Sequence, residues 1–85
     1  MMNFNYVISD RQGLHATNAM SLNRAACDYE SKITLKGERG TADCKNVLSL
    51  MSMGARQGES LVLTVDGPDE AAAMGYLSGL LRTML

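Results

Sequence analysis

The sequence predicts an α+β fold in which helices cover one face of a four-stranded antiparallel sheet. Two observations carry this prediction. First, the spacing of apolar residues changes repeatedly between two residues, which is typical of strands, and three to four residues, which is typical of helices. Second, the resulting order is β-α-β-β-α-β-α, and an α+β chain of 85 residues packs most simply with its helices on one side of the sheet. We therefore expect an open-faced sandwich with three helices, formed by one domain over residues 1–85.

The first strand is predicted at residues 3–9, where apolar and polar side chains alternate. Its apolar side consists of Phe4, Tyr6 and Ile8. Residues 10–13 are turn-like, and an amphipathic helix of about three turns is predicted from Ala16 onward. Its buried face consists of Ala19, Leu22, Ala26 and Tyr29. Thr17 and Asn18 stand at its start, and both are residue types that cap helices.

The second and third strands are predicted at residues 32–36 and 41–44, joined as a hairpin by the tight connection 37–40. Ile33 and Leu35 face inward, and the outward side chains are polar: Lys32, Thr34 and Lys36. A short helix follows. It carries Val47, Leu48, Leu50 and Met51, with Asn46 as its N-cap and Gly54 ending it in a left-handed conformation.

The fourth strand is predicted at residues 59–66, with Leu61, Leu63 and Val65 on one face. Val62 on the other face makes it the most hydrophobic strand, so we expect it at the centre of the sheet. The last helix begins at residues 67–70, where a proline lies in the first turn and two acids lie at the positive end of the helix dipole. Its buried stripe consists of Ala73, Leu77, Leu80, Leu81 and Met84.

Composition excludes several classes of function. The net charge of −1 provides no basic field for nucleic acid. The apolar runs are far shorter than a membrane span, and residues 1–5 do not resemble a signal peptide, so we expect no membrane insertion. One histidine and the distant pair Cys27 and Cys44 predict neither a metal site nor a cofactor. We expect two reduced cysteines in a cytoplasmic protein, with a disulfide between them as the alternative.

The single histidine, His15, lies at the junction between the first strand and the first helix. Backbone N–H groups and the positive end of the dipole make a helix N-terminus a place for an anion. A proton-transfer role would need an orienting carboxylate, for which Asp10 is near in sequence. A phosphoryl acceptor is the better match, because the first-turn residues Ala16, Thr17 and Asn18 can stabilise the phosphoryl group. The alternative is an exposed loop histidine without a role.

Several motifs occur in the order and spacing of one family. They are Gly13-Leu14-His15-Ala16, the helix 48–54, Gln57-Gly58 and the segment 66–71. Over essentially the whole chain, the sequence resembles HPr, the histidine-containing phosphocarrier of the bacterial sugar phosphotransferase system. The resemblance implies that enzyme I phosphorylates Nδ1 of His15, with phosphoenolpyruvate as the original donor. The phosphoryl group then passes to the A component of a sugar permease.

The resemblance also implies that these partners supply the catalysis, so we expect a carrier and not an enzyme. The family's docking surface surrounds the histidine and the short second helix. The matching positions are Met20, Val47, Leu48 and Met51. Exposed apolar residues there would form an interaction patch, whereas the alternative for each of them is a place in the core. The sequence does not indicate an oligomeric state.

The sequence departs from the family's Gly-Leu-His-Ala-Arg-Pro-Ala pattern, with Thr17 at the arginine position and Asn18 at the proline position. Loss of a charge-assisted hydrogen bond of about 1.5–3 kcal/mol would slow transfer by one to two orders of magnitude. Asn18 adds a backbone N–H that proline lacks. Arg11 and Arg24 are candidate substitutes for the missing charge. The alternative function is therefore an HPr-like regulatory or interaction module with weak or no phosphotransfer.

Asn46 is a second departure. Many HPr proteins of low-GC Gram-positive bacteria carry a regulatory serine here, which an HPr kinase phosphorylates. Asparagine caps a helix well but cannot be phosphorylated. We therefore expect no regulatory phosphosite and no kinase-dependent switch at this position.

Overall fold

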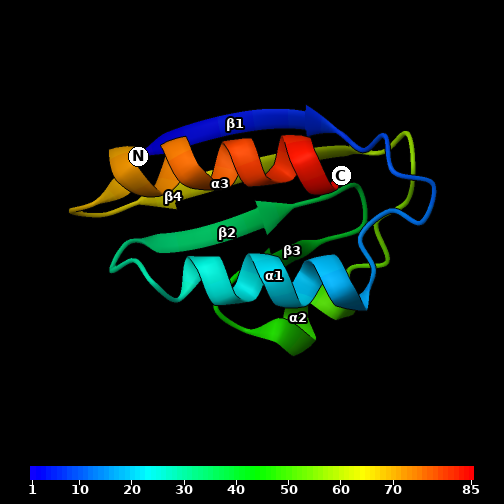
Figure 1. Ribbon diagram of the computed structural model, residues 1–85, viewed down its shortest axis with the longest axis horizontal. Helices are drawn as coiled ribbons and strands as arrows, with labels where there is room; N and C mark the ends of the chain where they lie inside the picture. The colour runs from blue at the N-terminus through cyan, green and yellow to red at the C-terminus, as the bar shows by residue number, and fades with distance from the viewer.

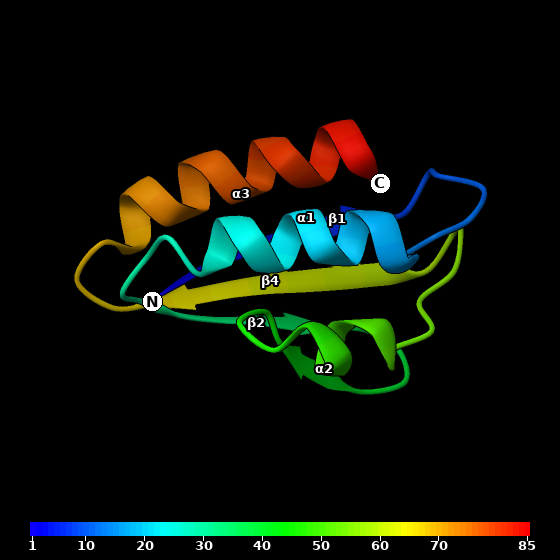
Figure 2. The ribbon, with the colours of Figure 1, turned by 60° about the horizontal axis from the view of Figure 1, so that its bottom comes forward.

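The computed structural model describes residues 1–85 and confirms the predicted α+β architecture. Four strands form one antiparallel sheet in the order β1-β4-β2-β3 (Figure 1). The three helices lie on one face, with α1 between α3 and α2 and in contact with both (Figures 1 and 2). The elements are β1 (Met2–Val7), α1 (Ala16–Ala26), β2 (Lys32–Lys36), β3 (Thr41–Asp43), α2 (Val47–Met51), β4 (Ser60–Asp66) and α3 (Glu70–Met84).

The strand β4 lies at the centre of the sheet, as its hydrophobicity predicted, and pairs with both β1 and β2. Leu63 lies opposite Phe4 on one side and Leu35 on the other. Because directly opposite residues of paired strands point to the same side of a sheet, these three residues share the helix-covered face. Leu61, Leu63 and Val65 are all 0% exposed, so this strand forms the floor of the core.

The core is one cluster of 20 buried residues, to which every helix contributes. Leu22 from α1, Leu50 from α2 and Leu77 from α3 are each fully buried. Full burial of a leucine side chain contributes about 1.5–3 kcal/mol. These contacts fix α1 relative to the sheet and to the other two helices.

The structure corrects some boundaries. The helix α1 ends at Ala26, because the N–H groups of Asp28 and Tyr29 bond three residues back and tighten the chain into a turn. Tyr29 therefore lies beyond the helix and packs half-buried against the core. In α3, Leu80 and Met84 are half-buried, and Met74 is a buried residue that the predicted stripe omitted.

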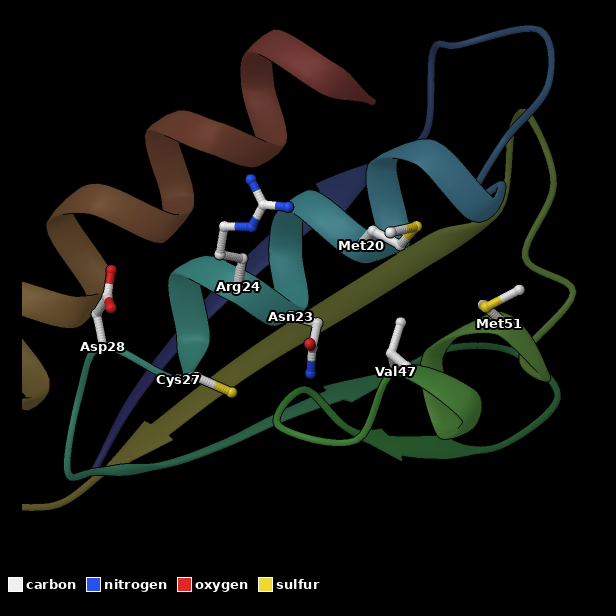
Figure 3. Close-up of a pocket in the computed structure, with 7 residues that line it drawn as sticks. All are labelled: Met20, Asn23, Arg24, Cys27, Asp28, Val47 and Met51. Atoms are coloured by element: carbon white, nitrogen blue, oxygen red, sulfur yellow. The ribbon is translucent and has the colours of Figure 1, made fainter.

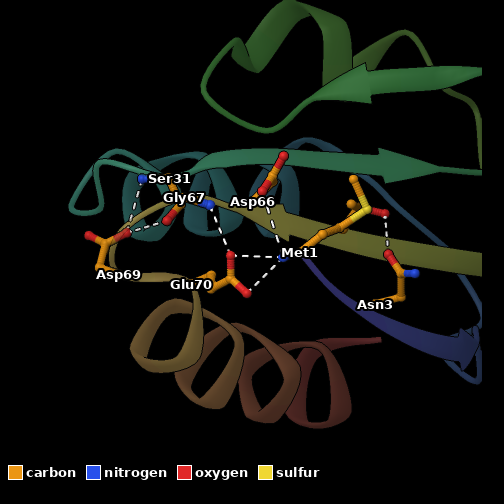
Figure 4. A network of polar contacts seen from close by, with 8 residues as sticks. Met1, Asn3, Ser31, Asp66, Gly67, Asp69 and Glu70 are labelled. Atoms are coloured by element: carbon orange, nitrogen blue, oxygen red, sulfur yellow. Dashed lines mark hydrogen bonds and ion pairs between the residues drawn. The ribbon is translucent and has the colours of Figure 1, made fainter.

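A polar network joins the start of α3 to the start of β1 and to the turn before β2, at the opposite end of the molecule from the start of α1 (Figures 2 and 4). The Glu70 carboxylate accepts from the Met1 ammonium at 2.8 Å and from Gly67 N at 3.1 Å. The Asp69 carboxylate accepts from the N–H groups of Glu30 at 2.8 Å and Ser31 at 3.0 Å and from the Ser31 hydroxyl. These bonds to Asp69, foremost that from the Ser31 hydroxyl, lower the pKa of its carboxyl group.

Candidate functional site

His15 is the N-cap residue of α1, with extended backbone at φ −109° and ψ 176°. Its carbonyl oxygen accepts the first helical hydrogen bond from Ala19 N at 2.9 Å. The imidazole is 32% exposed and therefore accessible to another molecule. Ala16 and Thr17 begin the helix, so their N–H groups have no partner inside it. The structure thus places the histidine directly before these two free donors.

Asn18 has a structural role that the sequence analysis missed. Its side chain is buried, accepts a hydrogen bond from His15 N at 2.8 Å and donates one to Gly13 O at 3.0 Å. Both polar atoms are therefore used inside the chain, and only the backbone N–H belongs to the first-turn donor set. The available signal was the spacing of three residues between the N-cap and Asn18, as in a capping box.

The loop before His15 packs against the loop that follows α2, and the two run side by side in both ribbon views (Figures 1 and 2). Leu14 N donates to Ala55 O at 3.0 Å. Gly13 has a left-handed φ of +65°, and a Cβ there would lie 2.3 Å from Ala55 O and 2.8 Å from Arg56 Cα. Only glycine fits this position without movement of one of the loops.

The residue that follows α3 also forms hydrogen bonds with the loop before His15. The buried Leu85 presents its carbonyl oxygen to the N–H group of Ser9 and to that of Asp10, the latter at 2.8 Å. The Ser9 hydroxyl donates to the same oxygen at 3.0 Å. Three donors from the loop thus converge on one carbonyl group.

Asp10 faces the histidine, and the structure supplies the geometry that the sequence could not. Asp10 Oδ2 lies 3.6 Å from His15 Nε2, within ion-pair distance when the ring is protonated. The other ring nitrogen, Nδ1, is bonded to Cγ and so lies on the backbone side of the ring. There the His15 side chain faces the N–H of Asn18 without making a hydrogen bond of ordinary geometry. Nδ1 is therefore the nitrogen nearer to the helix N-terminus.

Three arginines are relevant to a phosphoryl group on this ring. Arg24 lies nine residues along α1 from His15, about 13 Å by helix rise, and is not placed to assist. Arg11 lies in the exposed turn directly after Asp10. Arg56, which the sequence analysis did not name, has its backbone against Gly13. Neither Arg11 nor Arg56 forms an ion pair within the chain.

An apolar surface adjoins the site on α1 and α2. Met20 is 53% exposed, Leu48 70% and Met51 45%, while Val47 is half-buried. A groove of about 480 Å³ lies between the two helices (Figure 3). Its lining consists of Met20, Asn23, Arg24, Cys27, Asp28, Val47 and Met51. Three of the four predicted docking residues line this groove, and Leu48 lies outside it.

The remaining predicted positions are also defined. Asn46 caps α2, and its Oδ1 accepts from Leu48 N at 3.1 Å and from Ser49 N at 3.2 Å. Both cysteines are free: Cys27 is exposed, whereas burial raises the pKa of the Cys44 thiol to about 12. No three side chains of His, Cys, Asp or Glu are grouped so as to hold a metal ion. None of the helices has the length and apolar character needed to cross a membrane.

The fold and the site define a class: a small open-faced sandwich that presents one accessible imidazole at a helix N-terminus beside an exposed apolar surface. The chain matches the protein family described as PTS HPr component phosphorylation site over residues 2–83. It therefore belongs to the HPr family.

Similar proteins agree with this assignment. The phosphocarrier protein HPr of Treponema pallidum is 35% identical over 75 residues, covering 88% of this chain and 85% of that protein. The one from Mycoplasma genitalium is 32% identical over 83 residues, covering 96% and 94%. Among solved structures, a mycoplasma histidine-containing phosphocarrier protein has a TM-score of 0.93 at 26% identity, covering 96% of this chain and 93% of its own. An HPr from Thermoanaerobacter tengcongensis has a TM-score of 0.89 at 28% identity, covering 98% and 93%.

Proposed function

We propose that this protein is a phosphocarrier of the sugar phosphotransferase system that accepts a phosphoryl group on Nδ1 of His15 from enzyme I. It then passes the group to the A component of a sugar permease. The protein itself is not an enzyme in this proposal, since its partners supply the catalytic groups. It works in the cytoplasm, where its two free thiols stay reduced.

One observation carries the proposal: the single histidine is accessible and caps a helix whose first N–H groups are free. Those N–H groups and the helix dipole favour the negative charge of a phosphoryl group beside Nδ1. Family membership supports the carrier role, and the relatives named as phosphocarriers favour it over an interaction module.

The partners dock, in this proposal, on the exposed apolar side chains of Met20, Leu48 and Met51 and on the half-buried Val47. Methionine adapts its shape to different contact surfaces, which suits a carrier that must bind a donor and an acceptor in turn. Asn46 offers no hydroxyl, so we expect no phosphate on α2 after incubation with an HPr kinase and ATP.

The test uses the purified protein, enzyme I and labelled phosphoenolpyruvate. We expect acid-labile label on the wild-type protein and none on His15→Ala. A competent HPr from another source in the same reaction serves as the positive control. An unlabelled wild-type protein beside a labelled control would refute the carrier role.

A further inference from the structure

Asp10 is the charged group that the structure places against the imidazole of His15, at 3.6 Å from Nε2. The surrounding main chain fixes its position. Asp10 N donates to Leu85 O at 2.8 Å, and Asp10 O accepts from Gly13 N at 3.0 Å. The second carboxylate oxygen, Oδ1, accepts from Gln12 N at 3.2 Å. The carboxylate is thus held in place before any phosphoryl group arrives.

We propose that Asp10 is a positioning residue for phosphoryl transfer at His15, acting as the counter-ion of the phosphorylated ring; this inference rests on the proposed function. In the free protein, the carboxylate favours a proton on Nε2. The lone pair then stays on Nδ1, the nitrogen nearer to the helix N-terminus. The ring is therefore in the tautomer that can attack phosphorus.

The transfer step requires no proton movement. The Nδ1 lone pair forms a bond to phosphorus, while the donor's bond to phosphorus breaks and its electron pair leaves with the donor atom. The ring becomes an imidazolium that carries the phosphoryl group on Nδ1 and the original proton on Nε2. Asp10 balances the positive charge that appears on the ring in this step.

The same proton governs the second transfer. When the Nδ1–phosphorus bond breaks, its electron pair returns to the ring. With Nε2 protonated, the leaving group is neutral imidazole; without that proton, it would be the far poorer imidazolate anion. By holding the proton on Nε2, Asp10 keeps the phosphoryl group transferable and also open to attack by water.

The informative variant is Asp10→Asn, which removes the charge and retains an oxygen for Gln12 N. Glu30→Gln is the matched control, because Glu30 is an exposed carboxylate fifteen residues beyond His15 that forms no ion pair and lies outside the groove between α1 and α2. Each protein is labelled with enzyme I and phosphoenolpyruvate, and two quantities are measured at neutral pH: the rate of labelling and the half-life of the phosphohistidine.

We expect Asp10→Asn to be labelled about threefold more slowly, as for a partly exposed ion pair, and to lose its label more slowly than wild type. Glu30→Gln should match wild type in both quantities, and Asp10→Glu should move both back toward wild type. Equal rates and half-lives in wild type and Asp10→Asn would overturn the inference. Slow labelling without a longer half-life would also overturn it, because a distorted site explains that result. Failure of the proposed function is a separate outcome, in which wild type itself takes no label.

Discussion

Replacement of Asn18 by alanine should destabilise the protein by about 2–3 kcal/mol. The variant loses two hydrogen bonds, to His15 N at 2.8 Å and to Gly13 O at 3.0 Å, each with a net worth of about 1 kcal/mol. It also leaves the carbonyl of the buried Gly13 without this partner, which adds about 1 kcal/mol. The better helix propensity of alanine returns about 0.5 kcal/mol. The melting temperature should fall by roughly 10–20 °C for a domain of this size.

Urea denaturation of wild type, Asn18→Ala and Asn23→Ala measures these free energies of unfolding. Asn23 is the matched control, because it lies on the same helix and makes one hydrogen bond, to Cys44 O at 3.0 Å. By the same reasoning, loss of this bond, the unpaired carbonyl of the buried Cys44 and the gain in helix propensity together should cost Asn23→Ala about 1.5 kcal/mol. If the two variants lost equal stability, the reasoning that the two hydrogen bonds of the Asn18 side chain stabilise the loop before His15 would be refuted.

Three further predictions follow from the site and its surroundings. Thr17→Arg should raise the rate of phosphoryl transfer about tenfold or more in the enzyme I assay, because it adds a charged donor beside His15; an unchanged rate would count against this. Asp69, whose carboxyl pKa is lowered from 3.8, stabilises the fold above that pH, and this contribution is lost as the pH falls below it. In Asp69→Asn, the urea midpoint should therefore fall less steeply below about pH 4 than it does in wild type. Curves of urea midpoint against pH that run parallel for the two proteins would contradict this. A thiol reagent such as dithionitrobenzoate should modify only Cys27 in the folded protein and both cysteines in urea, since Cys44 is buried with a thiol pKa of about 12; rapid reaction of two thiols in the native state would show this to be wrong.

The sheet could be predicted from sequence because its signal is local. Alternation at residues 32–36 and 60–66 indicates both the strands and their buried faces, and the apolar outer residue Val62 indicates the central strand. The end of α1 was harder to predict. Tyr29 continues the helical spacing of apolar residues, but the chain has already turned at Cys27. A side chain on such a turn can reach the same core as one on the helix, so periodicity alone does not separate the two cases.

Those features of the site that are formed by one continuous stretch of sequence could be predicted. His15 and the free donors of the first turn follow from a strand–helix junction. The contacts of Asp10 with Leu85, and of Gly13 with the loop after α2, join segments far apart in the chain, and no local pattern reveals them. The two bonds of the Asn18 side chain depend on the path of the loop, which sequence spacing alone does not define.

The three hydrogen bonds from the loop before His15 to the Leu85 carbonyl affect how the amide protons of that loop exchange with solvent. The amide protons of Ser9 and Asp10 can exchange with solvent only when their hydrogen bonds to Leu85 O break, which requires the loop and the residue after α3 to separate. Native-state hydrogen exchange at these amides should therefore report the separation of the loop from Leu85 and not the fraying of α1. Opening of the loop beside His15 is thus coupled to Leu85, seventy residues from the histidine in the sequence.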